Sequence, residues 1–259
     1  MSRGFGVASG LAREVAAPLA ARCEELGYSS LWSNDTPLAS GLETLADFAR
    51  GANRADLGVT IALDRHGPDQ LAAQVERLEL NRGRLWLAIG AGHEEKPLTT
   101  MREALPALRD ALPGIRLALA AMGPKMCALG GASYDAVFFN WITPEFAAKS
   151  RQLVERGAAD AGREAPPVFG YVRTAVGTDA EERLEKEESF YRDLHKGYRD
   201  HFDRLGEPVG TVGVAAQETG EAQTQLSRYR ALDTVVVRAL ASATIESMSA
   251  LAEAAAPGD

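Results

Sequence analysis

The chain alternates short apolar runs with amphipathic stretches, and this alternation constrains the fold more than any other feature. The first five of the runs recur roughly every 30 residues, the length of one strand-and-helix unit. The eight runs cover residues 5–8, 30–33, 57–63, 85–89, 116–120, 136–140, 168–176 and 234–237. Eight strands alternating with helices predict a (β/α)8 barrel, here as a single domain over residues 1–259. A doubly wound parallel sheet is the alternative, because it produces the same local pattern.

The stretches between the runs have the spacing of helices. Residues 11–26 place apolar side chains every four positions from Leu11 to Cys23, which is the repeat of one helix face. Residues 68–80 begin with Pro68, and proline is favoured in the first helical turn. Thr143, Pro144 and Glu145 combine a capping hydroxyl, a first-turn proline and an acidic residue, so they predict a helix start.

The longest interval between strands, residues 178–233, contains a charged segment with one apolar side. Its apolar residues recur at three and four positions. They are Tyr191, Leu194, Tyr198, Phe202 and Leu205. This pattern predicts either a helix packed on the barrel wall or a surface that binds a second copy of the chain. His195 and His201 are expected at the surface of the same segment.

Composition limits the partners and the compartment. The formal net charge of −8 and the pI near 5.2 argue against nucleic acid or an anionic membrane as the main partner. No apolar run approaches the length of roughly 18 residues that a membrane span needs. Cys23 and Cys127 have no metal-type spacing. The chain is therefore expected to be cytoplasmic, with both cysteines reduced.

In a barrel of this type the residues that follow the strands build the site. The fourth apolar run ends in Gly90-Ala91-Gly92-His93, which suggests a dinucleotide fingerprint. That reading fails because Glu95 occupies the position of the third glycine. The glycines then indicate either a simple turn or close approach of a ligand. His93 is a candidate for proton transfer, and Arg173 and Arg238 lie on or beyond the last two strands.

The segment "AAMGPKM", residues 120–126, follows the fifth run. Gly123 allows close approach to the backbone, Pro124 suits a helix start, and Lys125 adds a positive charge, so the segment predicts either a phosphate cradle or an ordinary turn. The sequence contains no nucleophile elbow and no H-E-x-x-H motif, and no metal site is expected. This combination favours an enzyme whose cofactor carries the chemistry.

Three segments together resemble the luciferase-like monooxygenase superfamily of flavin- and F420-dependent (β/α)8 oxidoreductases. They are "AARCEELGYSSLWSND", "LGVTIALDRHGPDQLAAQVERLELNRGRLWLAIGAG" and "ALAAMGPKMCALGGASYDAVFFNWITPE". The resemblance runs from about Leu11 to Val176 and more loosely to Leu240. It implies coenzyme F420 or FMN across the C-terminal mouth of the barrel, and transfer of a hydride to or from a small organic substrate. Oxygen activation is the alternative chemistry with FMN.

The resemblance also implies a role for particular positions. The ring would rest on a bulge at Thr60-Ile61, often with a non-prolyl cis peptide in this family, and would border Gly90, Ala91 and Gly92. The cofactor phosphate would lie at Ala121, Met122, Gly123, Pro124 and Lys125, with Asn140 and Trp141 nearby. His93 and Asp35 are the candidates for proton transfer. Relatives acting on F420 often carry glutamate at the position of His93 and histidine near Asn34 or Asp35.

Two other functions stay open at this point. The chain is also compatible with a flavin-binding barrel without catalysis, or a structural subunit, because residues 92–115 are shorter than the insertion of many relatives. A metabolic barrel that binds a sugar phosphate would use the Gly-Pro-Lys segment as its phosphate clamp. The resemblance implies a homodimer.

Overall fold

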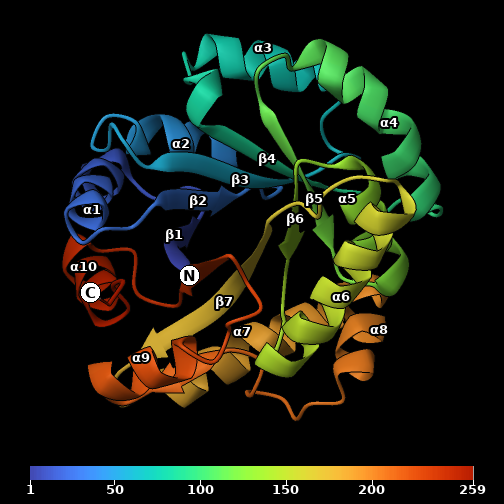
Figure 1. The fold of residues 1–259 in the computed structure, drawn as a ribbon. Helices are drawn as coiled ribbons and strands as arrows, with labels where there is room; N and C mark the ends of the chain where they lie inside the picture. The colour runs from blue at the N-terminus through green and yellow to red at the C-terminus, as the bar shows by residue number, and fades with distance from the viewer. Residues whose placement is uncertain (259) are drawn as a thin grey trace.

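The computed structural model describes residues 1–258, and in it eight parallel strands close into a barrel (Figure 1). The barrel strands are β1 (Ser2–Ala8), β2 (Ser30–Asn34), β3 (Asp56–Ala62), β4 (Leu85–Gly90), β5 (Arg116–Ala121), β6 (Ala136–Phe139), β7 (Val168–Val176) and β9 (Thr234–Ala239). Pairing of β6 with β7 and of β9 with β1 completes the ring. The predicted (β/α)8 barrel is confirmed, and the doubly wound alternative is wrong.

A ninth strand, β8 (Val214–Ala216), lies outside the barrel and pairs only with the end of β7. The sequence reading did not include it. Three residues are too few to show an alternating pattern. The strand is therefore defined by its pairing with Thr174–Val176 of β7 and not by its own composition.

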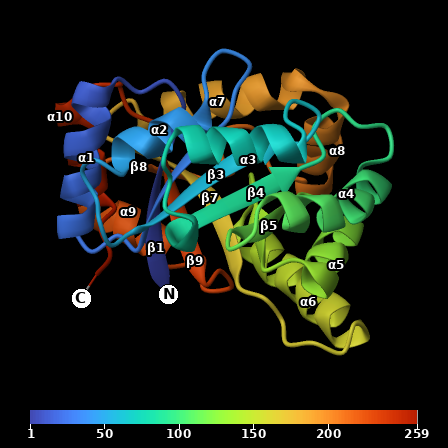
Figure 2. The same cartoon turned by 90° about the horizontal axis from the view of Figure 1, so that it is seen from above.

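Helices surround the barrel (Figures 1 and 2). They are α1 (Arg13–Glu25), α2 (Gly41–Phe48), α3 (Pro68–Arg77), the 3-10 turn η1 (Arg82–Arg84), α4 (Pro97–Ala111), α5 (Pro124–Ser133), α6 (Pro144–Asp160), α7 (Ala180–Leu194), α8 (Lys196–Leu205), α9 (Thr219–Leu226) and α10 (Ile245–Ala254). The predicted cap at Thr143 is present, because its hydroxyl accepts from the amide of Phe146 at 3.2 Å. None of the helices over residues 1–258 has the length and apolarity of a membrane span.

Two apolar layers hold the fold. The larger lies between the strands and the surrounding helices, where outward residues such as Leu31, Val59 and Leu87 are buried. The smaller fills the barrel and is mainly aromatic, with Trp32 and Phe138 ring centroids 4.6 Å apart. At the N-terminal end of the barrel the guanidinium of Arg116 lies 4.3 Å from the Trp86 ring centroid. The barrel is therefore a packed core, and ligands can reach only its ends.

Within the segment between β7 and β9, α7 contacts the barrel strand β7, as predicted for a helix on the barrel wall, whereas α8 packs against α7. In Figure 2, α7 and α8 lie together on the side of the molecule away from the N-terminus. His201 on α8 is 1% exposed, and its two ring nitrogens lie 2.9 Å from the Met122 carbonyl oxygen and 2.6 Å from that of Trp141. Since both carbonyls follow barrel strands at their C-terminal ends, α8 covers part of the barrel mouth.

Candidate functional site at the barrel mouth

Strand register decides which side chains line the mouth. Alternate residues of each strand face the barrel interior, and inward-facing residues at or near the C-terminal ends of the strands form a ring around the opening. The ring consists of Ala8, Asn34, Thr60, Gly90, Ala120, Asn140, Arg173 and Arg238. One part is small, with Gly90 next to Ala120, and the part formed by β6, β7 and β9 is polar and carries two positive charges.

The small side of the ring has room above the backbone. A Cβ atom at Gly90 would have the Ala120 Cβ at 3.4 Å as its nearest neighbour, which is ordinary contact. Gly90 and Ala120 are partly exposed. This side of the mouth is therefore open to solvent.

Gly92 was expected to make room for the cofactor ring, but the structure gives another reason for a glycine at this position. Its φ is +67°, and a Cβ there would lie 2.1 Å from a carboxylate oxygen of Asp64. Asp64 accepts from the backbone N–H of His93 at 2.9 Å and lies 3.0 Å from Nδ1 of the same residue. Burial raises the pKa of Asp64 and these bonds lower it, with a net shift downward. Gly92 therefore makes space for a carboxylate of its own chain.

The two residues proposed for proton transfer lie in separate clusters. The side chain of His93 is 74% exposed and pairs with Asp64. The side chain of Asp35 is 5% exposed, lies 3.0 Å from Nε2 of His66, and accepts from the amide of Gly41 at 3.0 Å. Asp35 thus holds the start of α2, whereas His93 stands at the rim, where its ring centroid is 5.1 Å from that of His195.

The expected bulge at Thr60-Ile61 is not formed. Both residues lie within β3, where Thr60 pairs with Asn34 and Ala88, and Ile61 pairs with Ile89. No peptide bond between the described residues is cis. Thr60 faces the mouth, but Ile61 is 3% exposed and belongs to the layer between strands and helices. Regular pairing on both sides of β3 leaves no extra residue to bulge.

The predicted phosphate segment forms the start of α5. Gly123 is its N-cap and Pro124 its first residue, so the amides of the first turn point away from the helix without partners in the helix. Lys125 is exposed, and Nη2 of Arg204 on α8 donates to the Met122 carbonyl at 3.2 Å. Ala121 is buried at the end of β5. Backbone donors, Lys125 and Arg204 together give this turn a positive potential.

Asn140 and Trp141 are part of a buried polar network beneath α7 and α8. Asn140 accepts a hydrogen bond from Nη1 of Arg173 and donates to the hydroxyl of Tyr198 at 3.2 Å. The guanidinium of Arg173 lies 4.0 Å from the Trp141 ring centroid. Trp141 has a φ of +51°, which is rare for a residue with a side chain. This conformation places the indole under α8, where it is fully buried.

Of the two histidines expected at the surface, His201 on α8 is misplaced. His201 is buried rather than at the surface, and His195 caps α8 by accepting from the Gly197 amide at 3.0 Å. Burial lowers the pKa of both, and the neighbouring His93 lowers that of His195 further. The position of His201 depends on contacts with loops far away in the chain, which the local pattern of a charged helix does not contain.

Arg173 and Arg238 were noted in the sequence only by their position after strands. A stronger signal was present. Each interrupts an apolar run two residues after an inward-facing side chain, Tyr171 in one strand and Val236 in the other. Period-two alternation therefore directs both arginines into the barrel.

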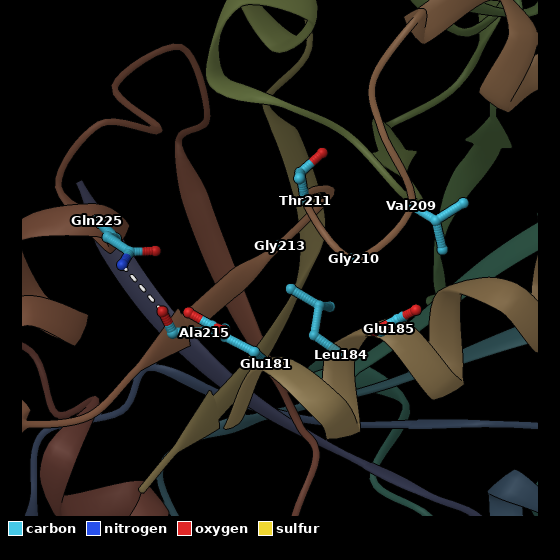
Figure 3. Close-up of a pocket in the computed structure, with 9 residues that line it drawn as sticks. All are labelled: Glu181, Leu184, Glu185, Val209, Gly210, Thr211, Gly213, Ala215 and Gln225. Carbon is cyan, nitrogen blue, oxygen red and sulfur yellow. Dashed lines mark hydrogen bonds between the residues drawn. The ribbon is translucent and has the colours of Figure 1, made fainter. Parts of the chain in front are cut away.

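Two hollows outside the barrel lie near β8. One, of about 370 Å³, is lined by α7, β8 and the loop before β8 (Figure 3). Gln225 donates there to the Ala215 carbonyl at 3.1 Å, and Glu181 and Glu185 make the lining acidic. Neither hollow contains the predicted site residues. We place the candidate site at the mouth, because the buried cations, free helix amides and small residues meet there.

Comparisons with known proteins identify the family of the chain and its fold. A family model described as luciferase-like monooxygenase matches residues 105–255, which is more than half of the chain. No curated protein sequence matches at a significant level. All the solved structures compared below share 16% of their residues with this chain, so they show the fold alone.

One is an F420-dependent secondary alcohol dehydrogenase in complex with an F420-acetone adduct, with a TM-score of 0.74 over 98% of both chains. Another is the coenzyme F420-dependent tetrahydromethanopterin reductase from Methanopyrus kandleri, with a TM-score of 0.75 over 98% of this chain and 96% of that chain. A third is a monooxygenase from Streptomyces bottropensis, with a TM-score of 0.68 over 99% of this chain and 98% of that chain.

Proposed function

The chain belongs to the luciferase-like monooxygenase family, and we propose that it is an oxidoreductase that binds coenzyme F420 or FMN at the barrel mouth. The substrate would be a small organic molecule. The observation that carries the proposal is the division of the mouth into a small, open side at Gly90 and Ala120 and a donor-rich side at Asn140 and Arg173. A flat ring with carbonyl oxygens along one edge matches such a division.

The residues of the mouth fit the cofactor in two respects. Unpaired buried N–H groups are present at Nε of Arg65, Nε1 of Trp141 and Nε of Arg173, and buried donors require acceptors. The start of α5 offers free amides together with Lys125 and Arg204, which suits a phosphate. Gly90 and Thr60 would then border the ring, and Met122 to Lys125 would hold the phosphate. Ala91, which the resemblance also placed at the ring, is 6% exposed and packs in the layer between strands and helices.

The bound cofactor would supply the hydride-exchanging carbon, or oxygen chemistry in the case of FMN. The protein residues would position the ring and move protons. His93 is exposed, so its imidazole can exchange protons with solvent, and Asp64 holds its ring by the contact at Nδ1. Asp35 is less accessible, and its carboxylate is already shared between His66 and Gly41. We therefore assign proton transfer to His93 first and Asp35 second.

The names of similar structures support the proposal without deciding the cofactor. Two are described as F420-dependent, and another as a 3,6-diketocamphane monooxygenase subunit in complex with FMN. The last is 13% identical to this chain, with a TM-score of 0.63. We retain both cofactors in the proposal for this reason.

The experiment is a fluorescence titration of the protein with F420 and, separately, with FMN. Saturable binding of F420 alone would support a deazaflavin hydride-transfer enzyme, and preference for FMN would support a flavin reductase or monooxygenase. Gly90→Val is expected to weaken binding at least tenfold, because its methyl groups would enter the open side of the mouth. An unchanged unfolding midpoint in this variant is the control. Failure of both cofactors to bind would refute the proposal and favour the sugar-phosphate or structural alternatives.

We also propose that the protein is a homodimer. The predicted apolar side of residues 179–205 is mostly turned into the mouth, since Phe202 is 1% exposed. Phe190 and Leu194 on α7 remain 59% and 47% exposed, and large exposed apolar side chains are typical of interfaces. Analytical ultracentrifugation of the wild type and of Phe190→Asp tests the proposal. A wild-type monomer at micromolar concentration would contradict it.

A further inference from the structure

Two buried arginines face each other across neighbouring strands of the barrel. Arg173 on β7 pairs in register with Arg238 on β9, and both side chains point into the barrel mouth. Arg173 is 2% exposed and Arg238 is 6% exposed. Like charges in directly opposed positions of a sheet destabilise it, and burial adds the cost of removing each charge from water. Such a pair therefore requires an explanation.

The chain does not provide a counter-ion for either arginine. Neither forms an ion pair with any carboxylate over residues 1–258. Arg238 donates to the Ala239 carbonyl at 2.9 Å and to the side-chain oxygen of Asn34 at 3.3 Å. Arg173 donates to the side-chain oxygen of Asn140. All these acceptors are neutral, so two positive charges remain uncompensated.

Aromatic contacts account for part of the stabilisation of one arginine. The Arg173 guanidinium lies 4.0 Å from the Trp141 ring centroid and 5.1 Å from that of Tyr191, and such contacts favour a buried cation. Glu187 on α7 also attracts it from a distance, although burial and the charge of Arg238 lower the pKa of Arg173. Arg238 has no such aromatic contact among the described residues.

The unpaired polar atoms near Arg173 are donors. Its Nε has no partner, and the same is true of Nε1 of Trp141, whose ring stacks on this guanidinium. Nε of Arg65, on the loop after β3, is a third such group. A set of buried N–H groups with excess positive charge is complementary to an oxyanion. Ser33, Arg116 and Arg183 also have unpaired buried atoms. Arg116 begins β5 and lies at the opposite, N-terminal end of the barrel.

We propose that Arg173 and Arg238 bind an anionic group of the substrate, such as a carboxylate, phosphate or sulfonate. This assignment rests on the proposed function and names the class of substrate. The cofactor phosphate has a separate cradle at the start of α5. The open, small side of the mouth at Gly90 on β4 lies across the barrel from β9, because three strands lie between β4 and β9 in either direction around the ring. Arg238 is therefore left to recognise the second ligand, and Arg173 borders both that ligand and the donor-rich side assigned to the ring.

The test measures thermal unfolding of the cofactor-free protein with sodium sulfate and with sodium acetate against sodium chloride at equal ionic strength. A saturable rise of the unfolding midpoint by several degrees is expected for the wild type. Arg173→Gln and Arg238→Gln should lose the rise, and Arg238→Lys should retain part of it because the charge is kept. Arg102→Gln, on the exposed surface of α4, is the matched control and should behave as the wild type does.

An equal anion effect in Arg238→Gln and the wild type would overturn the proposal, as would the absence of a saturable effect in the wild type. Calorimetric titration with sulfate gives the affinity directly. If Arg238→Gln fails to fold, the comparison of Arg238→Lys with Arg102→Gln still decides the question. Arg238→Lys should bind sulfate more weakly than Arg102→Gln if Arg238 is part of the anion site.

A second arm separates the substrate from the cofactor as the source of the anion. F420 and FMN are titrated into the wild type and into Arg238→Gln. Unchanged cofactor affinity together with lost sulfate binding supports the substrate assignment, whereas parallel loss of both would assign the arginines to the cofactor and overturn it. Sulfate binding by a wild type that binds neither cofactor would refute the proposed function and leave the anion site standing.

Discussion

Gly58 lies directly against the indole of Trp32 inside the barrel. A Cβ atom at position 58 would stand 2.3 Å from the ring, closer than two carbon atoms can approach. Trp32 is held from the other side by Phe138 and Phe169, with ring centroids at 4.6 Å and 5.9 Å. The indole therefore cannot move away from β3, and only glycine fits at position 58.

Gly58→Ala should lower the free energy of unfolding by about 1–3 kcal/mol, the usual cost of overpacking a close-packed core. Denaturant titration followed by fluorescence measures the change. Gly220→Ala is the matched control, because nothing lies within 4 Å of the Cβ position there, and alanine within α9 should stabilise by about 0.5–1 kcal/mol. A loss of equal size in both variants would show that backbone conformation, not contact with Trp32, determines the result.

Removal of one buried arginine should stabilise the cofactor-free protein. Arg238→Gln eliminates a like-charge contact with Arg173, and an amide can still donate to Asn34, so we expect a gain on the order of 1 kcal/mol. The unfolding midpoint at low salt is the measurement. A decrease of the midpoint would mean that hydrogen bonds from Arg238 to Asn34 and Ala239 outweigh the repulsion.

The seating of α8 over the mouth should weaken in acid. Burial lowers the pKa of His201 more than the carbonyls of Trp141 and Met122 raise it. Below a pH of about 6.5, the usual value for histidine, the unfolded imidazole binds a proton that the folded one resists, so stability falls as pH falls. Hydrogen exchange of the α8 amides should accelerate between pH 7.5 and 5.5, after correction for intrinsic exchange rates.

His201→Gln should reduce this pH dependence, since the amide has no charge to gain. His195→Gln is the comparison variant, because burial and His93 lower the pKa of His195 too, yet this residue is less buried. An unchanged acid effect in His201→Gln alone would assign the titration to His195.

Proton transfer by His93 predicts a kinetic effect. Once a substrate is found, His93→Ala should reduce kcat by about 10²–10⁴-fold, with cofactor affinity unchanged. Asp64→Asn should have a smaller effect, because it removes only the carboxylate that holds the ring. Undiminished turnover in His93→Ala would transfer the role to Asp35 or to another group.

The sequence predicted the barrel because each strand has a local signature. An apolar run such as residues 85–89 is buried on both faces of β4, and the recurrence of such runs identifies parallel pairing without knowledge of contacts. The alternation of side chains within each strand is also local, and it directs Arg173 and Arg238 into the barrel.

Other features depend on contacts that local patterns do not contain. His201 on α8 lies against the carbonyls of Met122 and Trp141, which are 79 and 60 positions away in the chain. The pattern of a charged helix therefore did not indicate that this histidine is buried. The bulge expected at Thr60-Ile61 came from resemblance to a family, and the regular pairing of β3 excludes it. Of the site residues, the positions of the strand ends were predictable, but the pairing of Asp35 with His66 and of His93 with Asp64 was not.

Closure of the barrel between β1 and β9 also has a consequence during synthesis. Ser2 and Thr234 pair in register, and the buried guanidinium of Arg3 donates to the carbonyls of Ala255 and Ala256 at 2.8 Å. Since β1 is synthesised long before β9, one edge of β1 stays uncovered until β9 has been made. Until then this edge of β1 exposes unpaired amides and carbonyls, which promote aggregation of a partly folded chain.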